Sequence, residues 1–160
     1  MKTKILNLLE TNAKMTPSEI AERLDAKVED VVAAIADLEA SKIICGYSAV
    51  IDWDKVSDDK VNALIEVSVT PQRGSGFDSI ANRISRFPEV DSVYLLSGGY
   101  DFVVMMKGKS MREISKFVFE KLSTLEMIKS TATHFVLRKY KDHGISFEAK
   151  EEHKRDNILL

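Results

Sequence analysis

The sequence predicts an α+β fold in which a helical unit comes first and a unit of strands and helices follows. Residues 1–50 carry apolar side chains at spacings of three and four, which is typical of amphipathic helices. Residues 61–142 instead give strands that alternate with helices. Between them, residues 51–60 are the predicted linker, because the rhythm changes after this stretch and residues 51–59 carry a net charge of −3.

Three helices are predicted in residues 1–50. The first ends near Asn12, and Thr16–Glu19 begins the second, because this stretch is a capping box with proline at the first helical position. The third helix follows after two or three residues. The apolar residues expected to face inward in the first two helices are Ile5, Leu8, Leu9, Ile20, Ala21 and Leu24. In the third helix, apolar residues fall at spacings of three and four, namely Val28, Val31, Val32, Ile35 and Leu38. The last two helices form a helix-turn-helix unit, and the apolar run 43–47 predicts a strand after it, so the unit is winged-helix-like.

The C-terminal unit is predicted to be ferredoxin-like, with the element order β-α-β-β-α-β. The predicted strands are residues 62–70, 90–96, 101–107 and 128–137. One helix stops at Pro88, and the other begins at the capping box Ser110–Glu113. Gly98-Gly99 predicts the turn of a hairpin between the two middle strands. The charged residues 143–160 predict a solvated helix or a frayed tail.

The two middle strands are apolar on both faces. On one face lie Val93, Leu95, Phe102, Val104 and Met106, and on the other lie Tyr94, Leu96, Val103 and Met105. Two helices can cover only one face of a four-stranded sheet, so a large apolar surface would stay exposed. The sequence therefore predicts at least a homodimer that forms through sheet faces.

Composition limits the class of protein. The 160 residues have a mass of 18.0 kDa and a net charge of −2, and 44% are hydrophobic, as in an ordinary globular protein. No apolar run approaches the roughly 20 residues that span a bilayer, and a secretion signal is absent, so we expect a cytoplasmic protein with no membrane partner. The one cysteine and three histidines show no metal spacing. Because no nucleophile–base pair or phosphate-binding loop occurs either, we expect no metal, no cofactor and no catalytic residues.

Several short motifs occur in a specific order. They are Ile5–Glu10, Asn12, Glu19–Leu24, Leu38–Glu39, Ile43–Ala49, Phe87–Val90 and Ser97–Phe102. Each motif is weak alone, but their order and spacing resemble the Lrp/AsnC family, the leucine-responsive transcriptional regulators of bacteria and archaea. The resemblance covers residues 2–142. It implies a DNA-binding domain in residues 1–50 and, in residues 61–142, a regulatory domain that dimerises, often assembles into octamers and binds an amino acid.

The resemblance also implies two sets of site residues. The expected DNA contacts are Thr16, Arg23, Lys27, Val28, Glu29, Asp30, Val32 and Ala33. The expected effector contacts are Ser97, Gly98, Gly99, Tyr100, Asp101 and Thr133. The glycines would let backbone amides approach an α-carboxylate while Asp101 pairs with an α-ammonium group; alternatively the loop is only a turn and Thr133 only a strand residue. Arg73–Gly76 can similarly hold an anion or simply turn the chain.

The third helix is acidic where DNA would lie. Its outward positions hold Glu29, Asp30 and the three alanines Ala33, Ala34 and Ala36, with Lys27 the only base. Carboxylates beside phosphates repel, and specific DNA binding depends on several neutralised phosphates. Lys14, Arg23 and Lys42 can supply some of them. Two hypotheses remain: a DNA-binding regulator controlled by a small effector, or a sensing or protein-interaction module of the same architecture with weak or lost specific DNA binding.

Overall fold

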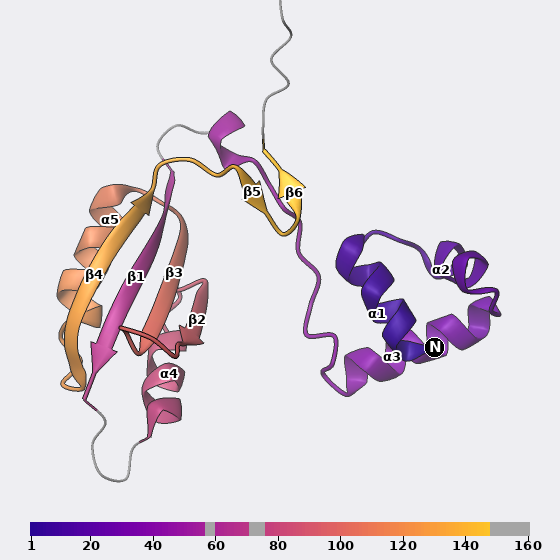
Figure 1. The fold of residues 1–160 in the computed structure, drawn as a ribbon, viewed down its shortest axis with the longest axis horizontal. Helices are drawn as coiled ribbons and strands as arrows, with labels where there is room; N and C mark the ends of the chain where they lie inside the picture. The colour runs from indigo at the N-terminus through magenta and orange to yellow at the C-terminus, as the bar shows by residue number, and fades with distance from the viewer. Residues whose placement is uncertain (57–59, 71–75, 148–160) are drawn as a thin grey trace, which may run out of the picture. The chain divides into compact units, whose positions relative to one another are not determined.

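The structure, a computed structural model, describes residues 1–56, 60–70 and 76–147. It separates into two compact units, Met1–Val50 and Ile51–Leu160 (Figure 1). Parts of three sequence-based predictions lie outside the described residues: 57–59 of the linker, 73–75 of the candidate anion loop and 148–160 of the tail. Within the described part of the chain, no helix is both long enough and apolar enough to cross a bilayer.

Three helices make the N-terminal unit, namely α1 (Lys2–Thr11), α2 (Pro17–Leu24) and α3 (Val28–Ala40). Their shared buried core consists of Ile5, Leu9, Ile20, Ala21, Val31, Ala34 and Leu38. On α3 only one stripe can face the other two helices, because the helix turns about 100° per residue. That stripe passes through Ala34, so the prediction that Ala34 points outward is wrong. Val28 and Val32 lie one turn apart on α3 and are 38% and 48% exposed, so they lie outside the buried stripe although their spacing matches it.

The segment after α3 is extended but is not a strand. Lys42 adopts a left-handed conformation (φ +58°) that reverses the chain, and the amides of Ile43 and Ile44 both donate to the Leu38 carbonyl at 3.0 Å. Tyr47 is tied back to α3, because its hydroxyl donates to Glu39 Oε1 at 2.8 Å. A strand needs a partner that completes its backbone hydrogen bonds. No described segment provides one for residues 43–47, so the predicted strand there is wrong.

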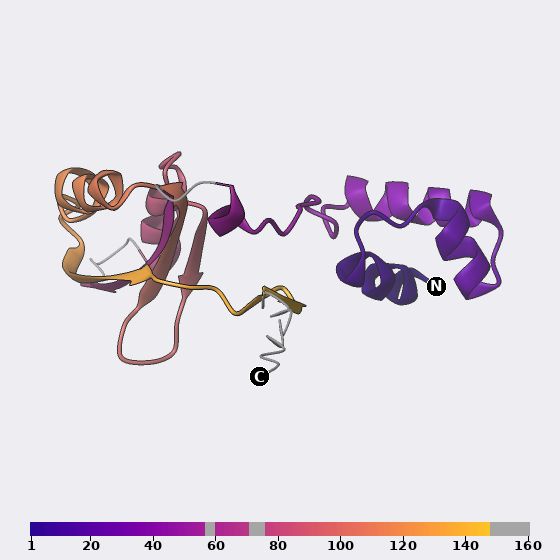
Figure 2. The same cartoon turned by 90° about the horizontal axis from the view of Figure 1, so that it is seen from above.

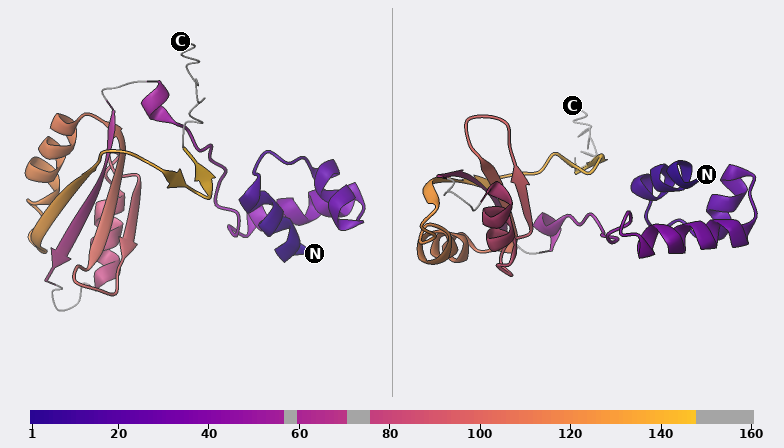
Figure 3. Two further views of the ribbon diagram at one scale, coloured as in Figure 1. Left: turned by 45° about the horizontal axis from the view of Figure 1, so that its top comes forward. Right: turned by 90° about the horizontal axis from the view of Figure 1, so that it is seen from below.

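The second unit has the element order that the sequence predicts. Its elements are η1 (Trp53–Lys55), β1 (Val61–Val69), α4 (Phe77–Ser85), β2 (Ser92–Leu95), β3 (Phe102–Lys109), α5 (Met111–Phe117), the π-helix η2 (Val118–Leu122) and β4 (Ile128–Val136). The four strands form one antiparallel sheet in the order β2-β3-β1-β4. Seen from above and from below, α4 and α5 lie on the same face of this sheet (Figures 2 and 3). The predicted α+β class is confirmed.

The two faces of the sheet differ in burial. Side chains on the helix-covered face are fully buried on the two central strands; they are Ala63, Ile65, Val67, Phe102, Val104 and Met106. Between them, Leu64, Val103 and Met105 point to the other face and are half-buried. Tyr94 lies opposite Val103 on that face and is 55% exposed. The sheet therefore carries an apolar surface that α4 and α5 do not cover, as the alternation in the sequence predicts.

A short hairpin follows the sheet. It pairs β5 (Lys141–Asp142) with β6 (Ile145–Ser146). The two residues of its turn, His143 and Gly144, have φ values of +47° and +78°, as a two-residue turn between antiparallel strands requires. The prediction of a solvated helix or frayed tail from residue 143 is therefore wrong at its start. A glycine at the second turn position was the signal for this hairpin.

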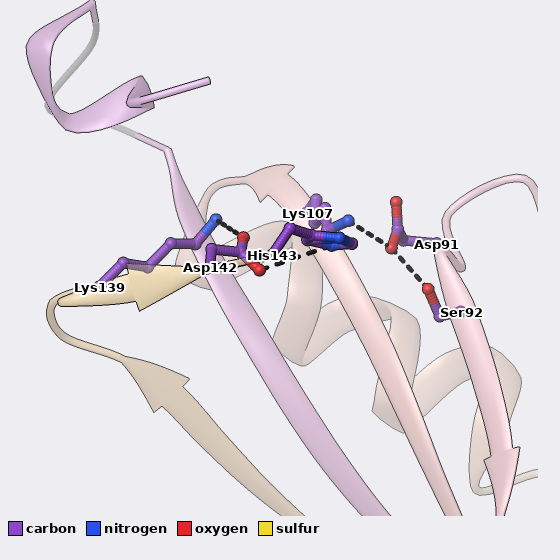
Figure 4. A network of polar contacts seen from close by, with 6 residues as sticks. All are labelled: Asp91, Ser92, Lys107, Lys139, Asp142 and His143. Atoms are coloured by element: carbon purple, nitrogen blue, oxygen red, sulfur yellow. Dashed lines mark hydrogen bonds and ion pairs between the residues drawn. The ribbon is translucent and has the colours of Figure 1, made fainter. Parts of the chain in front are cut away.

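Ion pairs flank this hairpin and the neighbouring sheet edge (Figure 4). Lys139 Nζ lies 3.5 Å from Asp142 Oδ2, and Lys107 Nζ lies 2.9 Å from Asp91 Oδ2. Ser92 Oγ also donates to Asp91 at 2.7 Å. Burial raises the pKa of Asp91, but the hydrogen bonds from Lys107 and Ser92, helped by the charges of Lys107 and Lys139, outweigh burial and leave that pKa below its ordinary value. The C-terminal hairpin is thus electrostatically linked to β2 and β3.

Candidate functional site

Local interactions determine where α2 begins and ends, and thereby how it connects to α3. At the start, Thr16 Oγ1 accepts a hydrogen bond from the Glu19 amide at 3.3 Å, and Glu19 Oε2 accepts one from the Thr16 amide at 2.7 Å. These hydrogen bonds with Thr16 lower the pKa of Glu19. At the end, Asp25 takes a left-handed conformation (φ +50°), and Lys27 caps α3 two residues later. The short connection fixes the angle between the two helices.

The eight residues predicted to contact DNA all reach the surface of this helix pair. They are Thr16, Arg23, Lys27, Val28, Glu29, Asp30, Val32 and Ala33. Lys14 and Lys42 are exposed as well, and none of the unit's four candidate cations lies within 4.0 Å of a described carboxylate. Glu29 and Asp30 occupy the first turn of α3, where negative charge suits the helix dipole. The surface therefore combines uncommitted cations with two carboxylates.

The predicted effector loop joins β2 to β3 (Figure 1). The hairpin forms, but its connection is the six-residue stretch Leu96–Asp101 rather than a two-residue turn. Asp101 fastens this loop to β1: its amide donates to the Val67 carbonyl at 3.1 Å, and its Oδ2 accepts from the Val69 amide at 2.8 Å. The Leu96 amide closes the loop by donating to the Asp101 carbonyl at 2.8 Å. One carboxylate oxygen of Asp101 is thus already bonded within the chain, and the pairing of Asp101 with a ligand ammonium group stays a prediction.

Tyr100 reaches the uncovered face of the sheet from the same loop. Its hydroxyl donates to the Glu66 carboxylate, and this hydrogen bond raises the pKa of Tyr100. Glu66 Oε2 also lies 3.2 Å from His134 Nε2 of β4. Sequence reasoning missed Glu66 and His134, because they are 68 residues apart and meet only through the pairing of β1 with β4. The loop is thus connected to the centre of the uncovered face.

The remaining predicted effector residues are not brought together in one chain. Ser97, Gly98 and Gly99 are exposed, and a Cβ atom added at either glycine would meet nothing within 4 Å. Thr133 lies opposite Ile65 on β4, and β1 separates β4 from β3 and its loop. Its side chain is half-buried on the helix-covered side, since its partner Ile65 belongs to the core. The loop is therefore open above its glycines, and Thr133 is not part of it.

Comparison with known proteins identifies the architecture. The family model of the Lrp/AsnC ligand binding domain matches residues 62–145, which is more than half of the chain. The chain belongs to the Lrp/AsnC family. The resemblance expected from the motifs is confirmed, and the chain is a transcriptional regulator of this family.

Relatives match along nearly the whole length of this Lrp/AsnC chain. YugG of Bacillus subtilis, an uncharacterized HTH-type transcriptional regulator, is 48% identical over 155 residues, which cover 96% of this chain and 93% of YugG. The leucine-responsive regulatory protein of Rhizobium meliloti is 27% identical over 139 residues, or 87% of this chain and 88% of that protein. The transcriptional regulator NMB0573 of Neisseria meningitidis, solved as a complex with L-Met, has a TM-score of 0.70 and 26% identity, and the match covers 88% of this chain and 90% of that one.

Proposed function

We propose that this Lrp/AsnC regulator binds double-stranded DNA through α2 and α3, which act as a helix-turn-helix unit. In this proposal residues 1–50 bind DNA, residues 51–60 link, residues 61–142 form a ferredoxin-like domain for dimerisation and effector binding, and residues 143–160 are a C-terminal extension. The observation that carries the proposal is the exposed α2–α3 surface, which is supported by a buried core and presents cations with no described carboxylate within 4.0 Å.

The geometry of α2–α3 suits the major groove of DNA. Lys27 is the N-cap residue of α3 and Arg23 lies in the last turn of α2, so both cations lie near the start of the helix that would enter the groove. Val32 and Ala33 follow on exposed positions of α3, where small apolar side chains can contact thymine methyl groups. A dimer would place two such helices about one turn of DNA apart.

Dimerisation is proposed to occur through the uncovered face of the sheet. Leu64, Val103, Met105 and Tyr94 lie together there, as the strand register shows. Burying apolar surface of this kind against a second copy is favourable, because water is released from it. Further assembly of dimers into octamers is part of the same proposal.

The proposed effector is an amino acid or a related small molecule bound at Ser97–Asp101. Open space above Gly98 and Gly99 gives a ligand carboxylate access to backbone amides, and Asp101 offers one carboxylate oxygen to an ammonium group. The complex of NMB0573 with L-Met supports an amino acid as the ligand class. An effector that binds one assembly state better than another shifts the population of that state and, through it, the affinity for DNA.

Charge-reversal variants test the DNA-binding proposal. Lys27→Glu and Arg23→Glu are each expected to abolish the gel shift of the promoter of the protein's own gene at low salt. Each substitution replaces an attraction to phosphate with a repulsion. Lys4→Glu on α1 is the matched control and should retain binding. If the Lys27→Glu and Arg23→Glu variants shift the promoter as well as the unchanged protein does, the helix pair is not the DNA surface.

A second candidate function rests on the carboxylates of α3. Glu29 and Asp30 are exposed next to Lys27, and they would weaken contacts with phosphate. In this alternative the chain is a sensing or protein-interaction module with weak or lost specific DNA binding. The double variant Glu29→Gln/Asp30→Asn discriminates: a regulator gains affinity for its promoter, whereas a module that has lost DNA binding stays indifferent to any DNA at low salt.

A further inference from the structure

A cleft of about 340 Å³ lies on the helix-covered side of the sheet, away from the effector loop. It is bordered by α5 and η2, by the connection from α4 to β2, and by the end of β3. Its apolar floor is made by Met106 and Phe117, both of which are buried. Its rim is made by six charged residues: Glu89, Lys109, Glu113, Lys116, Glu120 and Lys121. This volume suits a ligand of amino-acid size.

Most of the charges on the rim are already paired. Glu89 Oε1 forms an ion pair with Lys121, Lys116 lies 3.9 Å from Glu120, and Glu113 caps α5 through Ser110. Two groups of the rim, one ammonium and one carboxylate oxygen, have no hydrogen bond and no ion pair in the described structure.

The first of these groups is the ammonium of Lys109, which has no carboxylate oxygen within 4.0 Å among the described residues. From a longer distance its charge helps to lower the pKa values of Glu89 and Glu113. The second is Glu89 Oε2, which is shut off from solvent and has no hydrogen-bond partner in the described structure. A buried acceptor without a donor is costly. The terminal torsion of a glutamate is soft, so the Glu89 carboxylate, which borders the cleft and whose side chain is 24% exposed, can turn about it and present either oxygen to the cleft.

We propose that this cleft is a second small-molecule site, which binds a zwitterion of the α-amino-acid class with an apolar side chain. The ligand carboxylate binds the Lys109 ammonium, and the ligand ammonium donates to Glu89. The apolar side chain packs on Met106 and Phe117. A ligand of one charge would pair with only one of the two groups and would be repelled by the like charge of the other, whereas a zwitterion pairs with both.

Two further observations place this site in the fold. The cleft is bordered by η2, whose π-helical turn is shown by the 2.8 Å hydrogen bond from the Ser123 amide to the Val118 carbonyl, and such turns are frequent at functional sites. The cleft also lies at the opposite end of β3 from the effector loop. The seven steps from Phe102 to Lys109 span about 23 Å, so one small ligand cannot occupy both places.

The methionine methyl groups allow a direct test in the full-length protein. In protein labelled with ¹³C at the methionine methyl groups, L-leucine, L-methionine or L-phenylalanine is expected to shift the Met106 signal in a saturable way. Met105, whose side chain lies on the uncovered face of the sheet, is the internal control. The matched analogues of leucine, 3-methylbutylamine and 4-methylpentanoate, each lack one of the two charges and should bind about tenfold more weakly or worse.

Variants separate this site from the effector loop. Lys109→Met and Glu89→Gln should each weaken the Met106 response about tenfold or more, whereas their exposed counterparts Lys129→Met and Glu126→Gln should not. Asp101→Asn should leave the Met106 response intact, whatever it does to binding at the loop.

The proposal is overturned if none of the three amino acids moves the Met106 signal at millimolar concentration, or if the shift survives both Lys109→Met and Glu89→Gln. An amino acid that binds the protein and loses affinity in Asp101→Asn, but never moves Met106, would support the effector loop alone.

Discussion

Asp101 stabilises the β2–β3 loop, in addition to its proposed role in binding a ligand. Its carboxylate accepts from the Val69 amide, and its own amide donates to the Val67 carbonyl, so one side chain and one peptide group fasten the β2–β3 loop to β1. Hydrogen bonds to charged acceptors of this kind contribute about 1.5–3 kcal/mol. Any loss of effector response in an Asp101 variant must therefore be separated from a loss of local structure.

We expect Asp101→Ala to open this corner of the sheet locally. The Val69 amide loses its acceptor, so its hydrogen–deuterium exchange should speed up by about tenfold or more, while the amides of Ile65 in mid-strand change little. Asp101→Asn keeps an oxygen acceptor and should give a smaller increase. Unchanged exchange at Val69 in the alanine variant would show that the bond to Asp101 is dispensable.

Single residues show where prediction from sequence stops. The Ser97–Asp101 loop was identified from its glycines and acidic residue, because these features are local. The contact of Tyr100 with Glu66, and of Glu66 with His134, was not identified, because it depends on the register of β1 against β4. The sequence carried only a weak signal for this contact, a glutamate among the mostly apolar residues of β1.

At the scale of elements, α2 and α5 have the same N-terminal capping motif. Each begins with a reciprocal capping box, Thr16 with Glu19 and Ser110 with Glu113, and in each the hydrogen bonds lower the pKa of the glutamate. Because the folded-state pKa lies below the ordinary value of about 4.5, this stabilisation is complete above that pH. It is lost as the pH falls through the lowered, folded-state pKa.

We therefore expect Glu19→Gln and Glu113→Gln to reduce the dependence of thermal stability on pH below about pH 4.5. Melting curves followed by circular dichroism across the acid range would measure this. Glu126→Gln removes an exposed carboxylate without a capping role and serves as the control. If the capping variants and the control lose stability in parallel on acidification, the boxes do not contribute to the acid response.

Elements with local determinants were predicted well, and those with distant partners were not. The capping boxes and apolar stripes predicted the helices, and the alternation of side chains between two faces predicted the four strands of the sheet. The strand expected at 43–47 was wrong, because an apolar run cannot form a ladder without a partner. The hairpin at Lys141–Ser146 was missed, because its strands are too short for alternation to be visible.

At the scale of the whole molecule, the uncovered sheet face is the proposed surface of assembly. We expect Met105→Lys to yield monomers in sedimentation equilibrium, since it places a charge among Leu64, Val103 and Tyr94 on that face. The affinity for the promoter should fall as well, because a monomer contacts one half-site.

Phe119→Lys provides the matched control for this experiment. Phe119 is 80% exposed on η2, away from the sheet face, so its replacement should leave the assembly intact. A Met105→Lys protein that folds normally and still sediments as a dimer would mean that another surface joins the copies.

The open loop has a consequence for how such regulators diversify. A Cβ atom added at Gly98 or Gly99 would meet nothing within 4 Å in the described structure, and neither position requires a left-handed backbone. Substitutions here can therefore change the proposed ligand specificity of the loop without destabilising the fold. Paralogues can exchange its chemistry at little cost to the scaffold, and saturation libraries at these two codons should consist mostly of well-behaved proteins.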